Sequence, residues 1–314
     1  IEINRGTLNI EGKNGYTVNF NENKANINAQ SSGGAIETRG ASTVTIKNAN
    51  FDGNLASTYG GAIASNSTTS QVTITDSNFK NNSASTQFGG AIYNKGTMTI
   101  NATKSNVEFS GNTDSTGSNA IYNDGVLTLN TAAGKTMTFK DKIASSSTEK
   151  SFTKDGAGTL LIDGADMSDY SGKVDVKAGT IALTNSGKFF SGASEVKVSG
   201  TDATLNSMNG VIEQIDLGNL NLANDLKIAI DVDLSDGSID NYITTGTISG
   251  SKNIIIDTID IAAAIEPQNI KVVLLPHLAL TALSLSPPKN GNKKMASKLS
   301  SPIIIPYCDA LNPK

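Results

Sequence analysis

The sequence predicts an all-β fold, a right-handed single-stranded parallel β-helix of the solenoid type, on three observations. Two short motifs recur about every 30 residues, a period typical of solenoids whose repeats bury their apolar faces only by stacking on one another. Segments in which Thr alternates with apolar residues separate the motifs, and such alternation is typical of β-strands. Glycines, 30 among 314 residues, are expected at the corners between these strands.

The first motif is the tetrapeptide Gly-Gly-Ala-Ile. Its three intact copies are Gly33, Gly34, Ala35 and Ile36; Gly60, Gly61, Ala62 and Ile63; and Gly89, Gly90, Ala91 and Ile92. A degraded fourth copy, Ser-Asn-Ala-Ile, ends at Ile121 and suggests that the array of this motif stops there. Because glycine has no Cβ, a glycine pair lets the chain bend tightly, so we expect each copy to form a corner.

The second motif is Phe-x-x-Asn. Its four copies are Phe20 and Asn23, Phe51 and Asn54, Phe79 and Asn82, and Phe109 and Asn112. Stacked coils place equivalent residues above one another at the strand spacing of about 4.8 Å, so we expect a ladder of phenylalanine rings inside the stack. The alternative, that the rings are ligand contacts, fits the regular spacing less well. We expect the asparagines at a corner, where each side-chain amide can bond the next coil.

A third recurring feature is a short strand with a central Thr flanked by two apolar residues. It occupies Val44–Ile46, Val72–Ile74, Met98–Ile100 and Leu127–Leu129. In a β-strand the Thr faces one side and the apolar pair the other, so each copy supplies one strand per coil with its apolar face toward the core.

The two motifs together resemble the repeats of chlamydial polymorphic membrane proteins, which are autotransporters, over roughly residues 16–125. The resemblance implies a surface-exposed or secreted passenger domain that acts as a structural stalk and adhesin at the outer membrane or cell surface of a Gram-negative bacterium. It also implies molecules of host or neighbouring-cell surfaces as partners and a translocator β-barrel in the full-length protein. In that family the two motifs are associated with adhesion, which assigns this role here to the three intact Gly-Gly-Ala-Ile copies and to Phe51, Asn54, Phe79, Asn82, Phe109 and Asn112.

Beyond the repeats of residues 1–130, residues 131–266 are expected to continue the β-helix. Within them, about residues 154–186 resemble the passenger-associated transport repeat of many autotransporters, through the Gly-Thr-Leu segment at Gly158, the Tyr-x-Gly turn at Tyr170 and the Ala-Gly-Thr segment at Ala178. Residues 212–262 show an alternation in which Ile228, Ile230, Val232 and Leu234 oppose Ala229, Asp231 and Asp233. This indicates further coils, similar to stretches that precede the membrane barrel in pertactin-like passengers.

Residues 267–314 differ in composition, since all seven prolines, the single His277 and the single Cys308 fall there. Proline lacks the amide hydrogen that a sheet ladder needs, so we expect a poorly ordered tail, either a natural linker or an out-of-frame continuation. No amphipathic barrel strands follow, so we expect no membrane insertion by this segment itself. The chain starts without Met or a signal-peptide pattern, and with the repeats already under way, so we expect a fragment of a longer protein.

Composition disfavours several classes of function. The net charge is -4, and the only arginines are Arg5 and Arg39, so the chain offers no basic stripe for nucleic acid. One cysteine excludes an intrachain disulfide and a thiolate metal cluster. We therefore expect no metal and no cofactor. The acidic run from Asp231 to Gly237 is a poor calcium loop, because its Gly is one position late and Tyr242 stands where a bidentate Glu belongs; it indicates a strand followed by a turn.

Two alternatives to an adhesive stalk stay open at this point. Parallel β-helices also occur in carbohydrate-active lyases and hydrolases, which need clustered carboxylates, often beside Arg, Lys or His. The supply of such residues is poor here, since both arginines lie near the N-terminus and the one His in the tail, so we expect no catalytic residues and no enzyme. The other alternative is a purely mechanical spacer, which would bind no cell.

Overall fold

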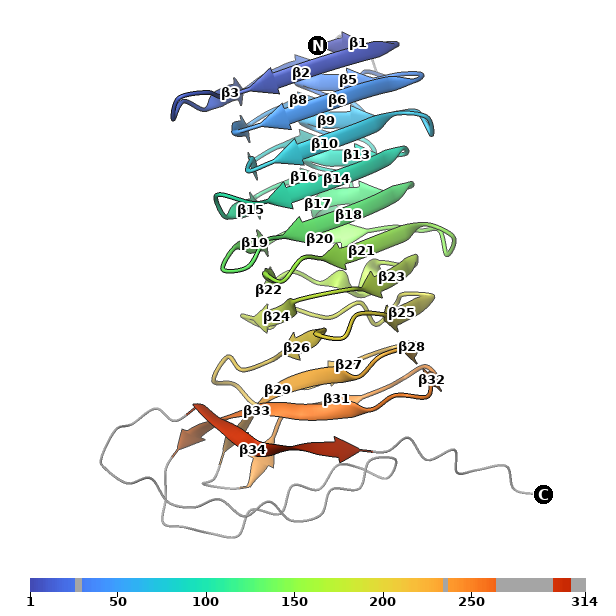
Figure 1. Cartoon of the computed structure of the whole chain (residues 1–314). Helices are drawn as coiled ribbons and strands as arrows, with labels where there is room; N and C mark the ends of the chain where they lie inside the picture. Colours follow the sequence, from blue (N-terminus) through green and yellow to red (C-terminus); the bar gives the residue numbers. More distant parts are fainter. Residues whose placement is uncertain (26–29, 234–236, 264–295, 306–314) are drawn as a thin grey trace, which may run out of the picture.

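The computed structural model describes residues 1–25, 30–233, 237–263 and 296–305, and in them the chain winds into coils that stack in chain order along one axis (Figure 1). Nearly all regular structure is β-strand; the single helical element described is the 3-10 turn η1, Met167–Asp169. Among the described residues, no helix has the length and apolar character needed to cross a membrane.

Three sheets run along the stack. Sheet 1 follows the Thr-centred strands and comprises, in order, β2 (Gly6–Glu11), β6 (Ser42–Lys47), β10 (Gln71–Thr75), β14 (Thr97–Ala102), β18 (Val126–Thr131), β21 (Ser151–Asp155), β23 (Lys173–Val176), β25 (Glu195–Val198), β28 (Leu220–Leu222) and β32 (Ile248–Gly250). Every pairing along this path is parallel, and each of the four predicted Thr-centred strands lies in one of its members.

Sheet 2 carries the phenylalanines of the second motif. It comprises β3 (Val18–Asn21), β7 (Ala49–Asp52), β11 (Asn78–Lys80), β15 (Val107–Ser110), β19 (Thr136–Phe139), β22 (Thr159–Asp163), β24 (Thr180–Thr184), β26 (Thr204–Asn206), β29 (Leu226–Asp233), β33 (Ile254–Ala263) and β34 (Ala296–Ile305). The last strand pairs antiparallel with β33, whereas the others are parallel.

Sheet 3 is confined to the first half of the chain. Its main path is β1 (Glu2–Ile3), β5 (Ile36–Thr38), β9 (Ile63–Ser65), β13 (Ile92–Asn94), β17 (Gly117–Asn123) and β20 (Lys142–Ala144). A row of two-residue strands joins it through β17 and comprises β4 (Lys24–Ala25), β8 (Leu55–Ala56), β12 (Ser83–Ala84) and β16 (Thr113–Asp114). Further along the chain, β27 (Gln214–Asp216) and β31 (Asn241–Ile243) form a separate parallel pair, and β30 (Ser238–Ile239) is antiparallel to β29.

The register pairs like residues with like. Ile74 lies beside Ile46 on one side and Ile100 on the other, and Val72 is flanked by Val44 and Met98. The inward side chains form one continuous hydrophobic core that extends from Ala35 to Ile259. The prediction of an all-β solenoid built from parallel strands is confirmed.

Two details differ from the sequence pattern or extend it. In β29, Ala229 and Asp231 were expected opposite the apolar face, yet both are buried; the backbone amides of Asn209 and Gly210 donate to Asp231, so a covering segment closes that face too. In the tail, residues 296–305 form β34, and Pro302 lies where the register between β33 and β34 is broken, which suits a residue without an amide hydrogen. His277 and Cys308 lie outside the described residues.

Candidate functional site

The phenylalanines of the second motif form the predicted ladder inside the stack. Ring centroids from Phe20 to Phe51, Phe79 and Phe109 are 4.7, 4.8 and 4.8 Å apart, and the rings are within 4° of parallel. Phe139 continues the ladder at 4.4 Å, although no Asn follows it at the motif spacing. From Phe51 onward these side chains have no exposed surface. Removal of each ring from water stabilises the fold by about 1.5–3 kcal/mol. The phenylalanines therefore have a structural role in the core.

The asparagines form a second ladder at the neighbouring corner. The side-chain oxygen of Asn82 accepts from the backbone N–H of Asn54 at 3.0 Å and from its side-chain amide at 2.8 Å. Asn82 in turn donates its side-chain amide to Asn112 at 2.9 Å and to the carbonyl oxygen of Phe51 at 3.0 Å. The ladder ends on the carboxylate of Asp141, which accepts from Asn112 at 2.8 Å. Because each buried amide is satisfied only through neighbouring coils, the ladder ties the coils together.

The glycine pairs form the predicted corners. The first glycine of each intact copy, Gly33, Gly60 or Gly89, has a positive φ of 60° to 78°, which residues with a Cβ rarely adopt. The second glycine touches the next coil: a Cβ on Gly61 would lie 2.1 Å from the carbonyl oxygen of Gly90. Only glycine fits this approach.

All the motif residues to which the resemblance assigns adhesion therefore lie in the interior of the rod or in its tightly packed corners. Their exposed fractions are below 9% apart from Gly34, which is partly exposed. A partner cannot reach the phenylalanine and asparagine side chains while the coils are stacked. Any binding by this repeat must use the residues between the motifs, which vary from coil to coil.

The outer face of sheet 3 is the most distinctive part of that variable surface. Its outward positions are in register from coil to coil and hold Glu37, Ala64, Tyr93 and Tyr122. Tyr59, from the corner before Gly60, packs on Tyr93 with ring centroids 4.4 Å apart. One coil further on, Phe88 stacks on Tyr122 at the same distance. Aromatic side chains thus line the outside of two successive corners.

Beside these rings lies a cleft of about 840 Å³, here called the Tyr93 cleft, whose lining includes Glu37, Arg39, Tyr59, Asn66 and Tyr93. Glu37 is largely buried and accepts two hydrogen bonds from the Arg39 guanidinium, at 3.0 and 3.1 Å. Asn66 donates to the same carboxylate at 2.6 Å. The hydrogen bond and charge of Glu37 raise the pKa of Arg39, so the guanidinium stays charged, and its two hydrogen bonds fix it in place.

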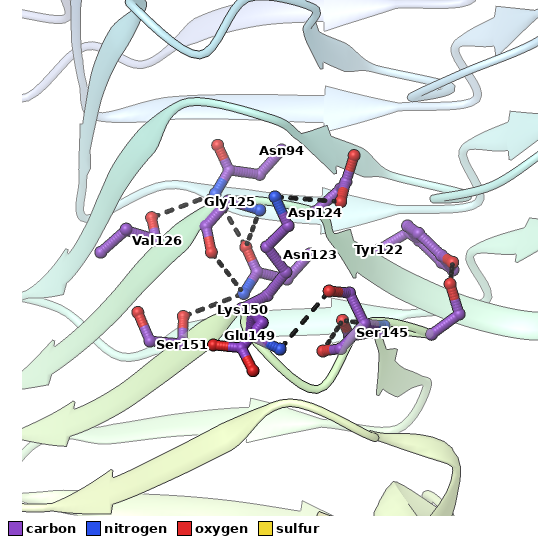
Figure 2. Close-up of polar contacts among 12 residues, drawn as sticks. Asn94, Tyr122, Asn123, Asp124, Gly125, Val126, Ser145, Glu149, Lys150 and Ser151 are labelled. Atoms are coloured by element: carbon purple, nitrogen blue, oxygen red, sulfur yellow. Dashed lines mark hydrogen bonds and ion pairs between the residues drawn. The ribbon is translucent and has the colours of Figure 1, made fainter. Parts of the chain in front are cut away.

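The hydroxyl of Tyr93 is fixed by contacts with the next coil. Burial and the charge of Asp124 raise the pKa of the Tyr93 hydroxyl, so the phenol stays neutral and donates to the Asp124 carboxylate at 3.3 Å. Lys150 lies 3.4 Å from the same carboxylate. On the inner side, Asn94 donates its side-chain amide to Asn123 at 2.9 Å (Figure 2).

This inner Asn94–Asn123 contact was missed by the sequence analysis. Asn123 passes the hydrogen bonding on to the Ser151 carbonyl oxygen at 2.9 Å and to the Tyr170 hydroxyl at 3.2 Å. The available signal was an Asn two positions after the Ile of the Gly-Gly-Ala-Ile copies, but it occurs in the last two copies only, because Thr38 and Ser65 stand there earlier.

A cluster of carboxylates further along the chain is closed to solvent. Asp231 and Asp240 have no exposed surface, and Asp240 accepts from Ser207 at 2.5 Å and from the backbone N–H of Glu213 at 3.0 Å. Among the described residues, no group of three or more His, Cys, Asp or Glu is arranged to hold a metal ion. Of the run considered as a calcium loop, Asp231 and Asp233 lie in β29, as the strand interpretation predicted; residues 234–236 lie outside the described residues.

Comparison with known proteins identifies one repeat of this rod. Residues 76–95 match the family model of the Chlamydia polymorphic membrane protein repeat. The matched segment runs from the Asp76 corner through β11 and β12 into β13, and it contains one copy of each motif. The resemblance drawn from the motifs is thus confirmed for this repeat. No curated protein and no solved structure matches the chain.

Proposed function

We propose that this chain is a surface-exposed passenger domain of an autotransporter, and that it acts as a rigid stalk and as an adhesin toward host or neighbouring-cell surfaces. The observation that carries the proposal is the family repeat at residues 76–95, set among coils that continue the same phenylalanine ladder from Phe20 to Phe139. A family of bacterial membrane proteins and an elongated rod together favour display at the cell surface.

The architecture supports a stalk in physical terms. Parallel strands join each coil to the next along the whole stack, and in solenoids stability is approximately a sum of terms for repeats and their nearest-neighbour interfaces. Such a rod can be built outside the cell coil by coil. The burial of the motif side chains leaves the loops and outward strand positions, rich in Ser, Thr and Asn, as the contact surface.

We propose no catalytic activity. The carbohydrate-active alternative requires carboxylates that converge on an accessible groove, whereas Asp231 and Asp240 are enclosed. In the Tyr93 cleft, Glu37 is engaged by Arg39 and Asn66. A screen for polysaccharide cleavage with and without calcium tests the proposed lack of catalytic activity. Cleavage of any polysaccharide would support the carbohydrate-active alternative instead.

Adhesion is tested with the full chain coupled to fluorescent beads. Attachment to cultured epithelial cells should exceed that of beads carrying Gly61→Val, in which a side chain is forced against the carbonyl oxygen of Gly90 and the stack is broken. Attachment of the intact chain no greater than that of uncoated beads would leave only the mechanical spacer, and equal attachment by both proteins would mean that binding does not depend on the stacked coils. Small-angle scattering of the same two proteins reports whether the rod is intact.

A further inference from the structure

We propose that the Tyr93 cleft binds a neutral oligosaccharide. The inference rests on the proposed function, because it names the ligand class that the adhesin would recognise. The cleft measures about 840 Å³, within the range of sites for small molecules. A second cleft of about 510 Å³ shares Glu37 and Arg39 with it. The two clefts meet at this pair, so the site is an elongated groove suited to several linked sugars rather than to one compact ligand.

The aromatic part of the groove suits the apolar faces of sugar rings. Tyr59 is partly exposed and lies against Tyr93 at an interplanar angle of 35°. Aromatic rings held in this way provide apolar contact area with little loss of conformational freedom on binding.

The polar part of the groove consists of planar groups, which match pairs of hydroxyls. The Arg39 guanidinium carries five N–H groups, of which two donate to Glu37. Asn66 and Glu37 are joined at 2.6 Å, so the carboxylate, the amide and the guanidinium form one rigid cluster. Such a preorganised set exchanges hydrogen bonds with hydroxyl groups without a large ordering cost.

The charges of the groove favour a neutral ligand over a sialylated or sulfated one. The single guanidinium of the groove is paired with Glu37, and Glu2 lies 3.6 Å from it as well. Two lysines, Lys24 and Lys95, also line the groove; both are exposed, and an exposed cation contributes little to affinity. An acidic sugar would meet two carboxylates around the one arginine. In the Tyr93 cleft itself the outward sheet face belongs to β5, β9 and β13, whose strands are paired on both sides, so a peptide finds no free strand edge in that cleft.

The test applies the full chain to a printed array of neutral, sialylated and sulfated oligosaccharides. We expect binding to neutral structures, and a loss of about 10-fold or more in affinity for Tyr59→Ala and for Asn66→Ala, as for residues at the centre of a binding site. The matched control is Tyr16→Ala, because Tyr16 is 77% exposed and lies outside the groove. Thermal melts show whether each variant is folded; Asn66→Ala decides the matter if Tyr59→Ala melts early.

The outcomes separate this inference from the adhesin proposal. Binding confined to sialylated or sulfated structures, or neutral binding unchanged in both groove variants, overturns the inference. Beads that still attach to cells without any signal on the array, or after enzymatic removal of cell-surface glycans, leave the adhesin intact and point to a protein ligand. Binding on the array without attachment to cells would support the oligosaccharide site in the groove and would contradict the adhesin proposal.

Discussion

Two regions of the stack differ in coil length and in how their interior is packed. We call residues 1–144 the ladder region and residues 145–263 the short-coil region; both contribute strands to sheets 1 and 2. In the ladder region, side chains that bond between successive coils are 28 to 31 residues apart. In the first coils of the short-coil region, comparable contacts span 21, 22 and 24 residues, and in its last coils they lengthen again to 28 and 29 residues. The shorter coils lack the strand that belongs to sheet 3, which ends at β20.

Aromatic packing changes at the same point. The phenylalanines of the ladder region stack face to face, whereas Tyr170 meets Phe152 and Phe190 edge to face, at 69° and 88°. The asparagine ladder also ends there, on Asp141, and the Asn94–Asn123 contact ends on the Tyr170 hydroxyl. Coils of equal shape can repeat one side chain along the axis. Where the shape of the coil changes, a different residue must satisfy the last amide.

The short-coil region relies on individual polar groups instead. Lys154 is buried and donates to three carbonyl oxygens, those of Asp155, Gly156 and Ala178, at 2.8 to 3.0 Å. The comparison teaches that coils of equal shape share their buried hydrogen bonds among many equivalent residues. In an irregular coil a single residue, such as Lys154, supplies several of these hydrogen bonds. Four changes test this difference, from the largest expected effect to the smallest.

Gly61→Ala should be the most damaging change. The new Cβ would lie 2.1 Å from the carbonyl oxygen of Gly90 and 2.4 Å from the backbone nitrogen of Ser83, so two coils must separate. We expect a loss of about 3–5 kcal/mol in the free energy of unfolding, measured by urea denaturation. In the short-coil region, Gly210→Ala meets no atom within 4 Å and only strains a φ of +82°, at a cost of about 1 kcal/mol. Equal costs would show that the ladder coils are not in such close contact.

Asn82→Ala should destabilise the ladder region by about 2–4 kcal/mol, because it leaves buried donors and acceptors on both neighbouring coils without partners. Hydrogen exchange should report the loss of protection at the backbone amide of Asn54, which donates to the side-chain oxygen of Asn82. Asn50→Ala is the matched control: its side-chain bonds to neighbouring coils are weaker, at 3.2 and 3.3 Å, and we expect a cost of about 0.5 kcal/mol. Loss of protection confined to the coil of Asn82 would contradict the ladder.

Lys154 should make the short-coil region more stable in alkali. Burial lowers the pKa of its ammonium to about 8, while the unfolded chain keeps the ordinary value of about 10.4. Between these values the unfolded state binds more protons, so the free energy of unfolding rises with pH, by about 2–3 kcal/mol in all. The rise, followed by urea denaturation from pH 7 to 10.5, should be absent in Lys154→Met. It should persist in Lys173→Met, where the replaced side chain is 52% exposed.

Acid should affect the contributions of Asp76, in the ladder region, and Asp240, in the short-coil region, in opposite directions, and this is the smallest effect that we expect. Burial raises the pKa of Asp76, but hydrogen bonds from Thr103, Lys104 and Ser105 outweigh it and the pKa lies below its usual value. That stabilisation is present above the unfolded pKa and is lost as pH falls through the folded one. Burial raises the pKa of Asp240, so stability is instead gained as pH falls through its folded pKa.

The variants Asp76→Asn and Asp240→Asn isolate these two carboxyls. As pH falls from 7 to 3, the unfolding free energy of the wild type minus that of Asp76→Asn should decrease, and the same difference for Asp240→Asn should increase. Thermal melts at each pH supply the values. Slopes of the same sign would mean that the environments of Asp76 and Asp240 do not differ in the way described.

Most of the ladder region could be predicted from its sequence. Phe51, Phe79 and Phe109 recur at the coil length, so their stacking follows from the period alone, and the glycine pairs mark corners because no other residue fits there. The end of the asparagine ladder could not be predicted, since Asp141 stands two rather than three positions after Phe139. The alternation in β29 wrongly placed Asp231 opposite the buried face. The side chain is buried because it is covered by Asn209 and Gly210, which lie 22 and 21 residues earlier in the sequence.

The Tyr93 cleft shows the same division. Glu37, Tyr59 and Asn66 have no motif in common, and the sequence analysis did not connect them. By itself the sequence determined the period, the parallel register and the identity of the core, because a repeated apolar pattern can be buried only by stacking like on like. Only the tertiary structure decided which outward residues meet, because residues a coil apart become neighbours only when the strands between them are paired at about 4.8 Å, and that depends on the length of every intervening loop.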